Sequence, residues 1–396
     1  MPVEAGFDCR PERWPDRIEM ESGYLVGLME QAVREGVFPG AVLCIQHRND
    51  GFYSTCCGRL SVHRPTACVT MRTVYDLASL TKVLAMTSVV LDCIRRREFD
   101  LETPVAEAIP DFAYGRVLVG HLLQHTSGLA TWRPYFEEVA AAAGGGWIAT
   151  ERGKAALRSM LLAEPLQSKP GVRVEYSDLG FILLDWFVER RTGAPLDRLF
   201  DRRIARRLGL RQLFFVDLKR PRQARRLRQG RSFADTERCA WRLRTLCAEV
   251  HDENCYVMGG VSGHAGLFGT AGDTVRLAAA WLDAARGRKS VFDGGLVRRF
   301  WSRSSGLGSS RALGFDTPST SDSQAGGRMG PATVGHLGFT GTSVWIDPDR
   351  ELIIALLTNR INPSRENQAI RGFRPVLHDA VVSEFEAGTL RRSLRS

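Results

Sequence analysis

The two ends of the chain share a pattern that restricts the possible folds more than any other feature of the sequence. Residues 20–36 carry apolar side chains at helical spacing, and this pattern stops at a glycine. Residues 40–45 and 52–56 have the character of two strands on either side of an Asn-Asp-Gly turn at 49–51, which is the turn chemistry of a β-hairpin. The beginning of the chain is therefore predicted to form a helix followed by a hairpin.

The other end of the chain repeats these elements in the reverse order. Residues 342–346 and 352–357 are mostly apolar, with Asp-Pro-Asp-Arg between them, which predicts a second hairpin. A helix is expected over residues 365–385, because apolar side chains recur there at helical spacing and Ser364 can cap its first turn.

Hairpins at both termini predict one antiparallel sheet that is built from the two ends of the chain. The fold class is then α/β, in the α+β sense, with an antiparallel sheet flanked by terminal helices and an inserted lobe that is mainly helical. We expect a single domain over residues 1–396, with a sheet lobe of 20–60 and 331–387 and an inserted helical lobe of 61–330. A cleft between two such lobes is where a site would form.

The net charge of +10 comes largely from arginine, and residues 219–231 hold seven basic residues and no acidic one. Such a run could bind nucleic acid or another polyanion, or it could be a solvated surface loop, which is the commoner role of a charge run. No zinc-finger, helix-turn-helix or RNA-recognition motif accompanies the run. A nucleic-acid partner is therefore not expected, whereas a small acidic substrate is compatible with the charge.

The N-terminal residues and the cysteines predict a cytoplasmic protein. Residues 1–20 carry charges and prolines and lack the apolar core of a signal peptide, and no run of about 18 apolar residues is present to span a membrane. The nine cysteines include no C-x-x-C pair, so a structural metal has little support and the cysteine usage suits a reducing compartment. We expect no metal, no cofactor and no membrane partner.

The stretch D-L-A-S-L-T-K places Ser79 and Lys82 at the start of an apolar helical run. Three residues apart on a helix, the two side chains share one face. A serine hydroxyl is a weak nucleophile that needs a neighbouring proton acceptor, and burial can lower the pKa of a lysine until the amine fills that role. The alternative is a helix-capping serine beside a surface lysine, which S-x-x-K alone does not exclude.

Tyr176 and Asp178 are the second candidate, directly before another apolar helical run. A tyrosinate that is stabilised by a nearby lysine could accept the proton of Ser79. The alternative is a buried tyrosine followed by a helix cap, which would have the same sequence pattern.

His336 and Gly338 are the third candidate, in a glycine-rich segment that leads into the C-terminal hairpin. A glycine at a strand edge lets a substrate lie close to the backbone and leaves N–H groups free to bind an oxyanion. The alternative is a glycine-rich turn with an incidental histidine.

In this order along the chain, S-x-x-K, Y-x-D and H-x-G resemble the three motifs of the serine β-lactamase and penicillin-binding-protein superfamily. The similarity is to class C β-lactamases, D-alanyl-D-alanine carboxypeptidases and family VIII carboxylesterases, and it extends from about residue 20 to residue 385. It implies the β-lactamase/transpeptidase-like fold and a serine hydrolase that needs no cofactor.

The resemblance also implies roles for individual residues. Ser79 would be the acylated nucleophile, with Lys82 and Tyr176 as its proton-handling partners. The backbone N–H groups of Ser79 and Phe339 would form the oxyanion hole. The residues that would line the substrate cleft are Asp178, His336, Gly338 and Phe339.

Two departures from the family pattern concern charge. Asp178 stands where lactamases and carboxypeptidases usually have asparagine, and His336 stands where class C lactamases have lysine. The first adds a negative charge and the second removes a fixed cation near the expected position of a substrate carboxylate. Both weaken the expectation of efficient β-lactam hydrolysis.

The expected function is hydrolysis of an ester or amide bond through an acyl-enzyme on Ser79. Residues 250–254 and 358–367 resemble a subgroup of muramyl-peptide amidases, so the alternatives include a cell-wall-recycling amidase or peptidase, and also a weak β-lactamase. The alternative that is not an enzyme is a sensor of the same fold that binds a peptide or a wall fragment.

Four residues near position 250 could be imagined as metal ligands, but their spacing fits no zinc motif. We expect them in a loop that borders the cleft. They are His251, Asp252, Glu253 and His264.

Overall fold

The computed structural model describes residues 23–48, 52–303, 309–388 and 390, so the predicted turn at 49–51 lies outside the described residues. The strands are β1 (Gly40–His47), β2 (Phe52–Gly58), β3 (Tyr75–Asp76), β4 (Leu213–Phe215), β5 (Arg238–Cys239), β6 (Arg244–Thr245), β7 (Leu267–Gly269), β8 (Val334–Leu337), β9 (Ser343–Asp347) and β10 (Leu352–Thr358). The α-helices are α1 (Gly23–Arg34), α2 (Ser88–Arg95), α3 (Val119–Leu123), α4 (Tyr135–Ala141), α5 (Glu151–Ala163), α6 (Asp178–Thr192), α7 (Leu196–Phe200), α8 (Pro221–Arg228), α9 (Glu253–Val257), α10 (Ala271–Ala285), α11 (Gly294–Trp301) and α12 (Ile370–Glu386).

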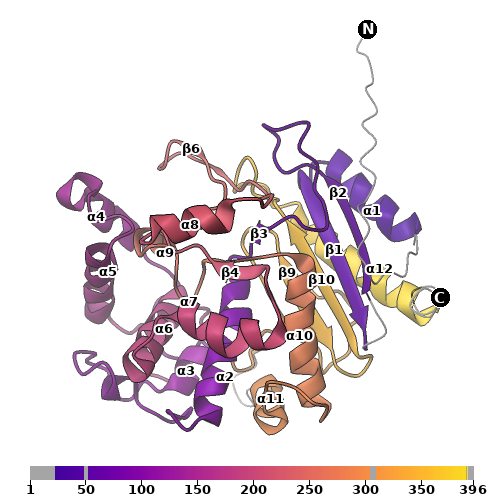
Figure 1. The fold of residues 1–396 in the computed structure, drawn as a ribbon. Helices are drawn as coiled ribbons and strands as arrows, with labels where there is room; N and C mark the ends of the chain where they lie inside the picture. The colour runs from indigo at the N-terminus through magenta and orange to yellow at the C-terminus, as the bar shows by residue number, and fades with distance from the viewer. Residues whose placement is uncertain (1–22, 49–51, 304–308, 389, 391–396) are drawn as a thin grey trace.

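A five-stranded antiparallel sheet in the order β2-β1-β10-β9-β8 joins the two ends of the chain (Figure 1). Strand β1 pairs with β10 in a register that runs from Ala41 opposite Thr358 to His47 opposite Leu352. The two predicted hairpins, β1–β2 and β9–β10, are present. The prediction of one antiparallel sheet built from both termini is confirmed.

Helices cover both faces of this sheet, because successive side chains of a strand point to opposite faces. On β1, Leu43 and Ile45 pack into the apolar cluster beneath α1 and α12, whereas Val42 and Cys44 belong to the cluster on the other face. Helix α10 packs against that other face, on β1, β9 and β10 (Figure 1). The lobe boundaries given above stay a prediction, and α10 lies within the span predicted to be inserted.

The C-terminal helix begins later than predicted. Helix α12 starts at Ile370, and Ser364 does not cap it, because the Ser364 Oγ accepts the N–H of Glu366 in a local turn. The Arg360 Nη1 donates to the carbonyl of Arg365 at 3.1 Å. A side chain five residues earlier therefore makes the hydrogen bond to a carbonyl that a helix would have paired with its own backbone.

The basic run 219–231 is largely helical, so the predicted loop is wrong, although Arg222, Arg225 and Arg226 are exposed to solvent. Helix α8 begins with Pro221 at its first position, where a missing N–H has no helical partner to lose. Only Ala224 of this helix is buried.

Two further observations concern membrane spans and the cysteines. Within the described ranges no helix is long and apolar enough to cross a bilayer. Cys68 is disulfide-bonded, whereas other cysteines such as Cys44, Cys93 and Cys255 are free thiols. The cysteines thus give no uniform indication of a reducing compartment, and a cytoplasmic location stays a prediction.

Candidate active site

Ser79 lies on a tight turn between strand β3 and a helical run. Ala78, directly before it, has a φ of 47°, a left-handed conformation that is uncommon for a residue with a side chain. Its N–H donates to Asp76 Oδ1 at 2.9 Å, which holds the turn. The helix after Ser79 is wound as a π-helix over Lys82–Thr87, and such segments frequently occur at functional sites.

Lys82 is fully buried and makes several polar contacts. Its Nζ lies 3.0 Å from Ser79 Oγ, 3.2 Å from the carbonyl oxygen of His264 and 2.7 Å from Asp178 Oδ1. The structure therefore brings two motifs that are distant in sequence onto one ammonium group. It also gives Asp178 a contact that sequence reasoning did not predict.

The pKa of Lys82 moves in the direction opposite to the sequence-based expectation. Burial lowers this pKa, but the Asp178 carboxylate and the Tyr176 phenol raise it by more, so that the pKa ends above its usual value. Lys82 is therefore an ammonium ion at neutral pH. As an ammonium it donates hydrogen bonds and has no lone pair to accept a proton.

Tyr176 lies on the other side of Lys82, whose Nζ is 4.9 Å from the centre of the tyrosine ring. The phenol interacts with both Lys82 and the Ser79 hydroxyl. Burial raises the pKa of Tyr176, and the Lys82 ammonium opposes this shift without cancelling it. The serine, the lysine and the tyrosine thus lie within mutual reach.

The residues directly before and after Tyr176 both form hydrogen bonds with His125. The N–H of Ser177 donates to His125 Nδ1 at 3.0 Å, and the N–H of Glu175 donates to the His125 carbonyl at 2.8 Å. Ser177 also caps α6 through its Oγ, which accepts the N–H of Gly180. The capping alternative for this motif is therefore correct for Ser177, and it occurs together with a tyrosine that faces the cleft.

His336 lies on β8 and is buried. Its Nδ1–H donates to the Leu337 carbonyl at 2.7 Å, and its buried Nε2 has no partner among the described residues. Burial lowers the pKa of His336 well below its usual value, and the charges of Arg311 and Lys82 lower it further. His336 is thus a neutral hydrogen-bond acceptor at this position.

Gly338 and Phe339 form the turn between β8 and β9. The Gly338 N–H donates to the Thr342 carbonyl at 2.7 Å, and a Cβ on Gly338 would lie 2.6 Å from the Leu77 carbonyl oxygen. The Phe339 ring is exposed and stacks on His251 at 5.6 Å. Within the described part of the chain, no acceptor is recorded for the Phe339 backbone N–H.

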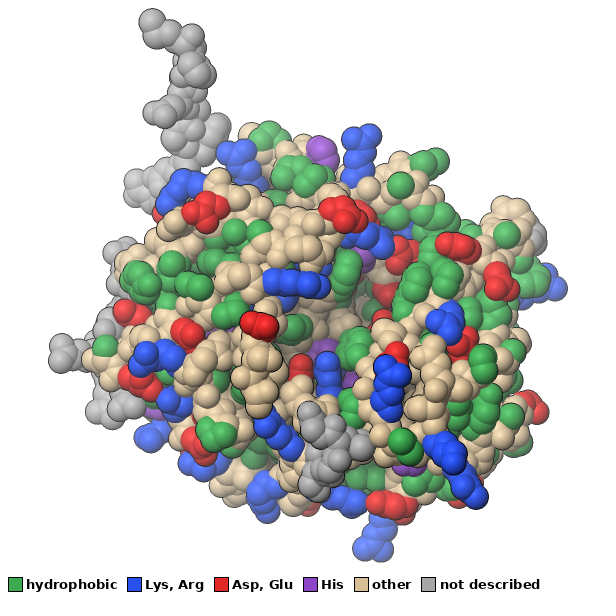
Figure 2. Space-filling view, turned by 180° about the vertical axis from the view of Figure 1, so that it is seen from behind, with side chains coloured by type: hydrophobic (Ala, Val, Ile, Leu, Met, Phe, Trp, Pro, Cys, Tyr) green, Lys and Arg blue, Asp and Glu red, His purple; other side chains and the backbone are tan. Residues whose placement is uncertain are grey.

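The Ser79 backbone N–H is also without a recorded acceptor within the described part of the chain. Ser79 and Phe339 both line one cavity of about 1080 Å³. The surface is hollowed on the face seen in Figure 2, and acidic, basic and histidine side chains gather around the hollow. The lining further includes Trp132, Tyr176, Asp178, Asp252, Glu253, His264, Arg311, His336, Gly338, Arg360, Arg365, Arg371 and Arg374.

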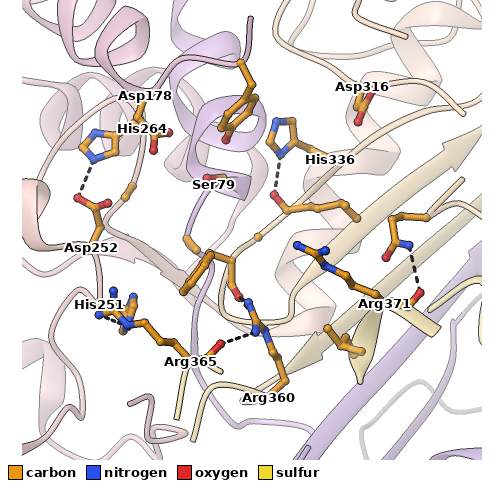
Figure 3. A pocket seen from close by; sticks show the side chains of 18 of the residues that line it. Ser79, Asp178, His251, Asp252, His264, Asp316, His336, Arg360, Arg365 and Arg371 are labelled. Carbon is orange, nitrogen blue, oxygen red and sulfur yellow. Dashed lines mark hydrogen bonds and ion pairs between the residues drawn. The ribbon is translucent and has the colours of Figure 1, made fainter. Parts of the chain in front are cut away.

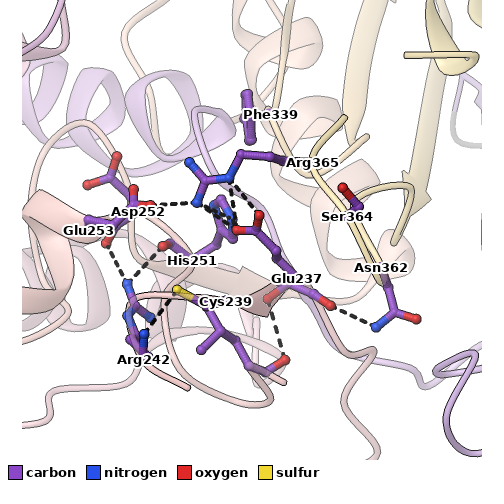
Figure 4. Close-up of polar contacts among 12 residues, drawn as sticks. Glu237, Cys239, Arg242, His251, Asp252, Glu253, Phe339, Asn362, Ser364 and Arg365 are labelled. Atoms are coloured by element: carbon purple, nitrogen blue, oxygen red, sulfur yellow. Dashed lines mark hydrogen bonds and ion pairs between the residues drawn. The ribbon is translucent and has the colours of Figure 1, made fainter. Parts of the chain in front are cut away.

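The segment 251–253 borders this cavity, as predicted, and its side chains are paired with protein groups. The His264 Nε2 lies 2.8 Å from Asp252 Oδ1, and both residues line the cavity (Figure 3). His251 contacts Glu237 at 2.9 Å, and Arg365 bridges that glutamate to Glu253 (Figure 4). Over the described residues no group of three or more His, Cys, Asp or Glu side chains could hold a metal ion.

Two arginines of the cleft were missed by the sequence reasoning. Arg360 lies after β10 and Arg374 lies on α12, and the side chains of both contact the turn that carries Phe339. The only sequence signal was indirect, since Arg360 falls within the segment 358–367 that resembles muramyl-peptide amidases.

Comparison with known proteins is consistent with this geometry. Residues 25–374 match the family described as Beta-lactamase. A relative from Escherichia coli (strain K12), named "Putative D-alanyl-D-alanine carboxypeptidase", is 31% identical over 321 residues, which cover 76% of this chain and 72% of the relative. The "N-acetylmuramyl-L-alanine amidase" of Bacillus subtilis (strain 168) is 31% identical over 367 residues, covering 84% of this chain and 79% of the relative.

Solved structures have the same fold. The unliganded simvastatin synthase LovD from Aspergillus terreus superposes with a TM-score of 0.70 at 20% identity, over 92% of this chain and 99% of that structure. At this identity the likeness concerns the fold alone. The predicted family, fold class and enzyme class are confirmed, and the chain is a serine hydrolase that belongs to the β-lactamase family.

Proposed function

We propose that the chain hydrolyses an amide or ester bond through an acyl-enzyme on Ser79. The observation that carries this proposal is the contact of 3.0 Å between Ser79 Oγ and the buried Lys82 Nζ at the wall of the cleft. An ammonium at this distance favours the ionised serine, and the burial of Lys82 strengthens that interaction.

Acylation begins when Ser79 Oγ attacks the carbonyl carbon of the substrate. This step uses the enzyme form in which the Tyr176 phenol has already given its proton to solvent, a form that burial disfavours and the Lys82 ammonium favours. The serine proton passes to the phenolate oxygen of Tyr176. The carbonyl oxygen becomes an oxyanion, which the backbone N–H groups of Ser79 and Phe339 bind. When the tetrahedral intermediate collapses, the bond to the leaving nitrogen or oxygen breaks, and Tyr176 returns the proton to that atom.

Deacylation repeats these steps with water as the nucleophile. Water attacks the Ser79 ester and gives its proton to Tyr176, and the oxyanion again binds at the same two donors. Collapse of the second intermediate releases the carboxylic acid, and the proton returns to Ser79 Oγ. The enzyme is then in its starting state.

The substrate class that we propose is a peptide-type amide derived from the cell wall. Both relatives described above carry names of enzymes that act on wall peptides or on the muramyl amide bond. The cavity of about 1080 Å³ slightly exceeds the usual range for small-molecule sites and leaves room for a peptide-sized substrate. The neutral His336 and the Asp178 carboxylate argue against β-lactams as efficient substrates, because no fixed cation stands at the position of His336.

The test compares the purified wild-type chain with Ser79→Ala. We expect a fluorophosphonate to label the wild type only, and we expect turnover of p-nitrophenyl acetate and release of L-alanine from N-acetylmuramyl-L-alanine. A chromogenic cephalosporin, assayed side by side, should be hydrolysed more slowly than either substrate.

Three outcomes would change the assignment. An unlabelled wild type, or a Ser79→Ala variant as active as wild type, would overturn the acyl-enzyme. Ester turnover without amide turnover would keep the hydrolase and remove the wall amide. Saturable binding of the muramyl compound without any turnover would favour the sensor instead.

A further inference from the structure

We propose that Arg374 and Arg360 are positioning residues of the oxyanion hole, which orient and polarise the backbone that carries the Phe339 N–H. This inference rests on the proposed function, because it assigns a role in the hydrolysis that is proposed to occur at Ser79.

Arg374 contacts the peptide unit that contains the oxyanion donor. Its Nη2 donates to the carbonyl of Gly338 at 3.3 Å and to the carbonyl of Thr342 at 3.0 Å. The Gly338 carbonyl and the Phe339 N–H belong to the same planar peptide group. A cation on the carbonyl oxygen draws electron density from the nitrogen, so the N–H becomes a stronger donor.

Arg360 holds the next peptide unit in place. Its Nε and Nη2 donate to the Phe339 carbonyl at 3.0 and 2.6 Å, and its guanidinium lies 4.8 Å from the centre of the Phe339 ring (Figure 3). The two arginines thus bind the carbonyls on both sides of the Phe339 residue. The direction of its N–H is thereby fixed before a substrate arrives.

The charges of these two arginines are not neutralised by any carboxylate in the described part of the chain. Both residues are 5% exposed, and their hydrogen bonds all go to carbonyl oxygens. Burial lowers the pKa of Arg374 to about 9 and that of Arg360 to about 10, so both stay protonated at neutral pH. Other cleft and sheet arginines, such as Arg365 and Arg350, have carboxylate partners.

Burying a cation without a counter-ion is strongly unfavourable for folding. Arg360 and Arg374 both contact the turn that carries Phe339. The Nε of Arg374 is buried without a partner among the described residues. A developing negative charge on the substrate carbonyl would compensate this arrangement. The positive field is therefore expected to stabilise the oxyanion more than the neutral substrate, which is the condition for a gain in rate.

The experiment uses the full-length chain with Arg374→Gln and Arg374→Lys. With p-nitrophenyl acetate we expect Arg374→Gln to lower kcat about tenfold, below the effect of deleting an oxyanion donor outright, while KM changes less than about twofold. Arg374→Lys keeps the charge and should recover most of kcat. A boronic acid, which forms a tetrahedral anion on serine, should bind Arg374→Gln about tenfold more weakly, in proportion to kcat.

The matched control is Arg350→Gln, which removes a partly buried arginine that is paired with Asp347 and Glu386 and lies outside the cleft. It should leave kcat and boronate affinity unchanged, even if its melting temperature falls as much as that of Arg374→Gln. The proposal is overturned if Arg374→Gln keeps wild-type kcat and boronate affinity, or if Arg374→Lys is no better than Arg374→Gln. In either case, fluorophosphonate labelling of the wild type would still support the proposed hydrolase activity.

Discussion

The two walls of the cleft differ in how their buried cations are paired. On the helical wall, Lys82 is paired with the Asp178 carboxylate at 2.7 Å, so the buried cation is neutralised. On the wall formed by the sheet edge and α12, Arg360 and Arg374 bind backbone carbonyls, and no carboxylate of the described chain pairs with them. The first arrangement allows a proton to move at little electrostatic cost, and the second maintains a fixed positive field.

The largest effect is expected on the helical wall. Lys82→Met removes the ammonium that favours both the ionised serine and the tyrosinate, so kcat with p-nitrophenyl acetate should fall about 10³-fold, within the usual range for a proton-transfer partner. The matched control is Lys154→Met, since Lys154 is another buried lysine, on helix α5, and is paired with Glu189 at 2.7 Å.

If Lys82→Met and Lys154→Met lost activity to the same extent, the effect would be one of stability. The special role of the helical wall would then be wrong.

The next effect tests the opposite wall. In Gly338→Ala, the added Cβ would lie 2.6 Å from the Leu77 carbonyl oxygen and would also meet the Thr342 side chain. The turn must shift, so the Phe339 N–H is displaced and kcat should fall about 10²-fold, as when an oxyanion donor is lost. Gly27→Ala on α1 has open space around its Cβ and serves as the control, measured by kcat and by thermal unfolding.

An active Gly338→Ala with a normal boronate affinity would show that the sheet-edge wall contributes no donor to the oxyanion. The difference between the two walls would then have no effect on catalysis.

The smallest expected effect concerns pH. The Asp178 carboxylate raises the pKa of both Lys82 and Tyr176, so Asp178→Asn should lower both pKa values. Because the proton acceptor must be deprotonated, the rising limb of the kcat/KM profile should move to lower pH, with a change of a few-fold at pH 7. Asp316→Asn is the control, since Asp316 lines the same cavity but is not among the groups that shift either pKa.

A limb that stays in place or moves to higher pH in Asp178→Asn would contradict the coupling of Asp178 to the proton-transfer groups. His336 adds a second criterion, because its pKa lies well below the usual value. No limb from its protonation should therefore occur near pH 6.5.

The sheet could be predicted because its signals are local. Strand and turn residues such as those at 40–45 and 352–357 have the spacing and chemistry of hairpins, whatever the rest of the chain does. The start of α12 could not be predicted in this way. It depends on Arg360, whose side chain binds the carbonyl of Arg365 and so supports an extended turn instead of the first turn of a helix.

The candidate site shows the same difference between features that local sequence motifs predict and features that depend on tertiary contacts. The sequence motifs pointed to Ser79, Lys82 and Tyr176, whose proximity the structure supports, although their catalytic roles stay proposals. The charge state of Lys82 was predicted in the wrong direction, because it depends on Asp178, a residue nearly a hundred positions away. The contacts of Arg374 with the 338–342 turn are also set by tertiary packing, which no short motif encodes.

The most direct test of the account is to locate the acyl group during turnover. The wild-type chain is mixed with p-nitrophenyl acetate, quenched with acid within the first turnover, and digested for mass spectrometry. We predict that the acetyl group is found on the peptide that contains Ser79, that it is absent from Ser79→Ala, and that it disappears when the substrate is exhausted. An active enzyme with no acyl group on Ser79, or with the group on another residue, would contradict the account.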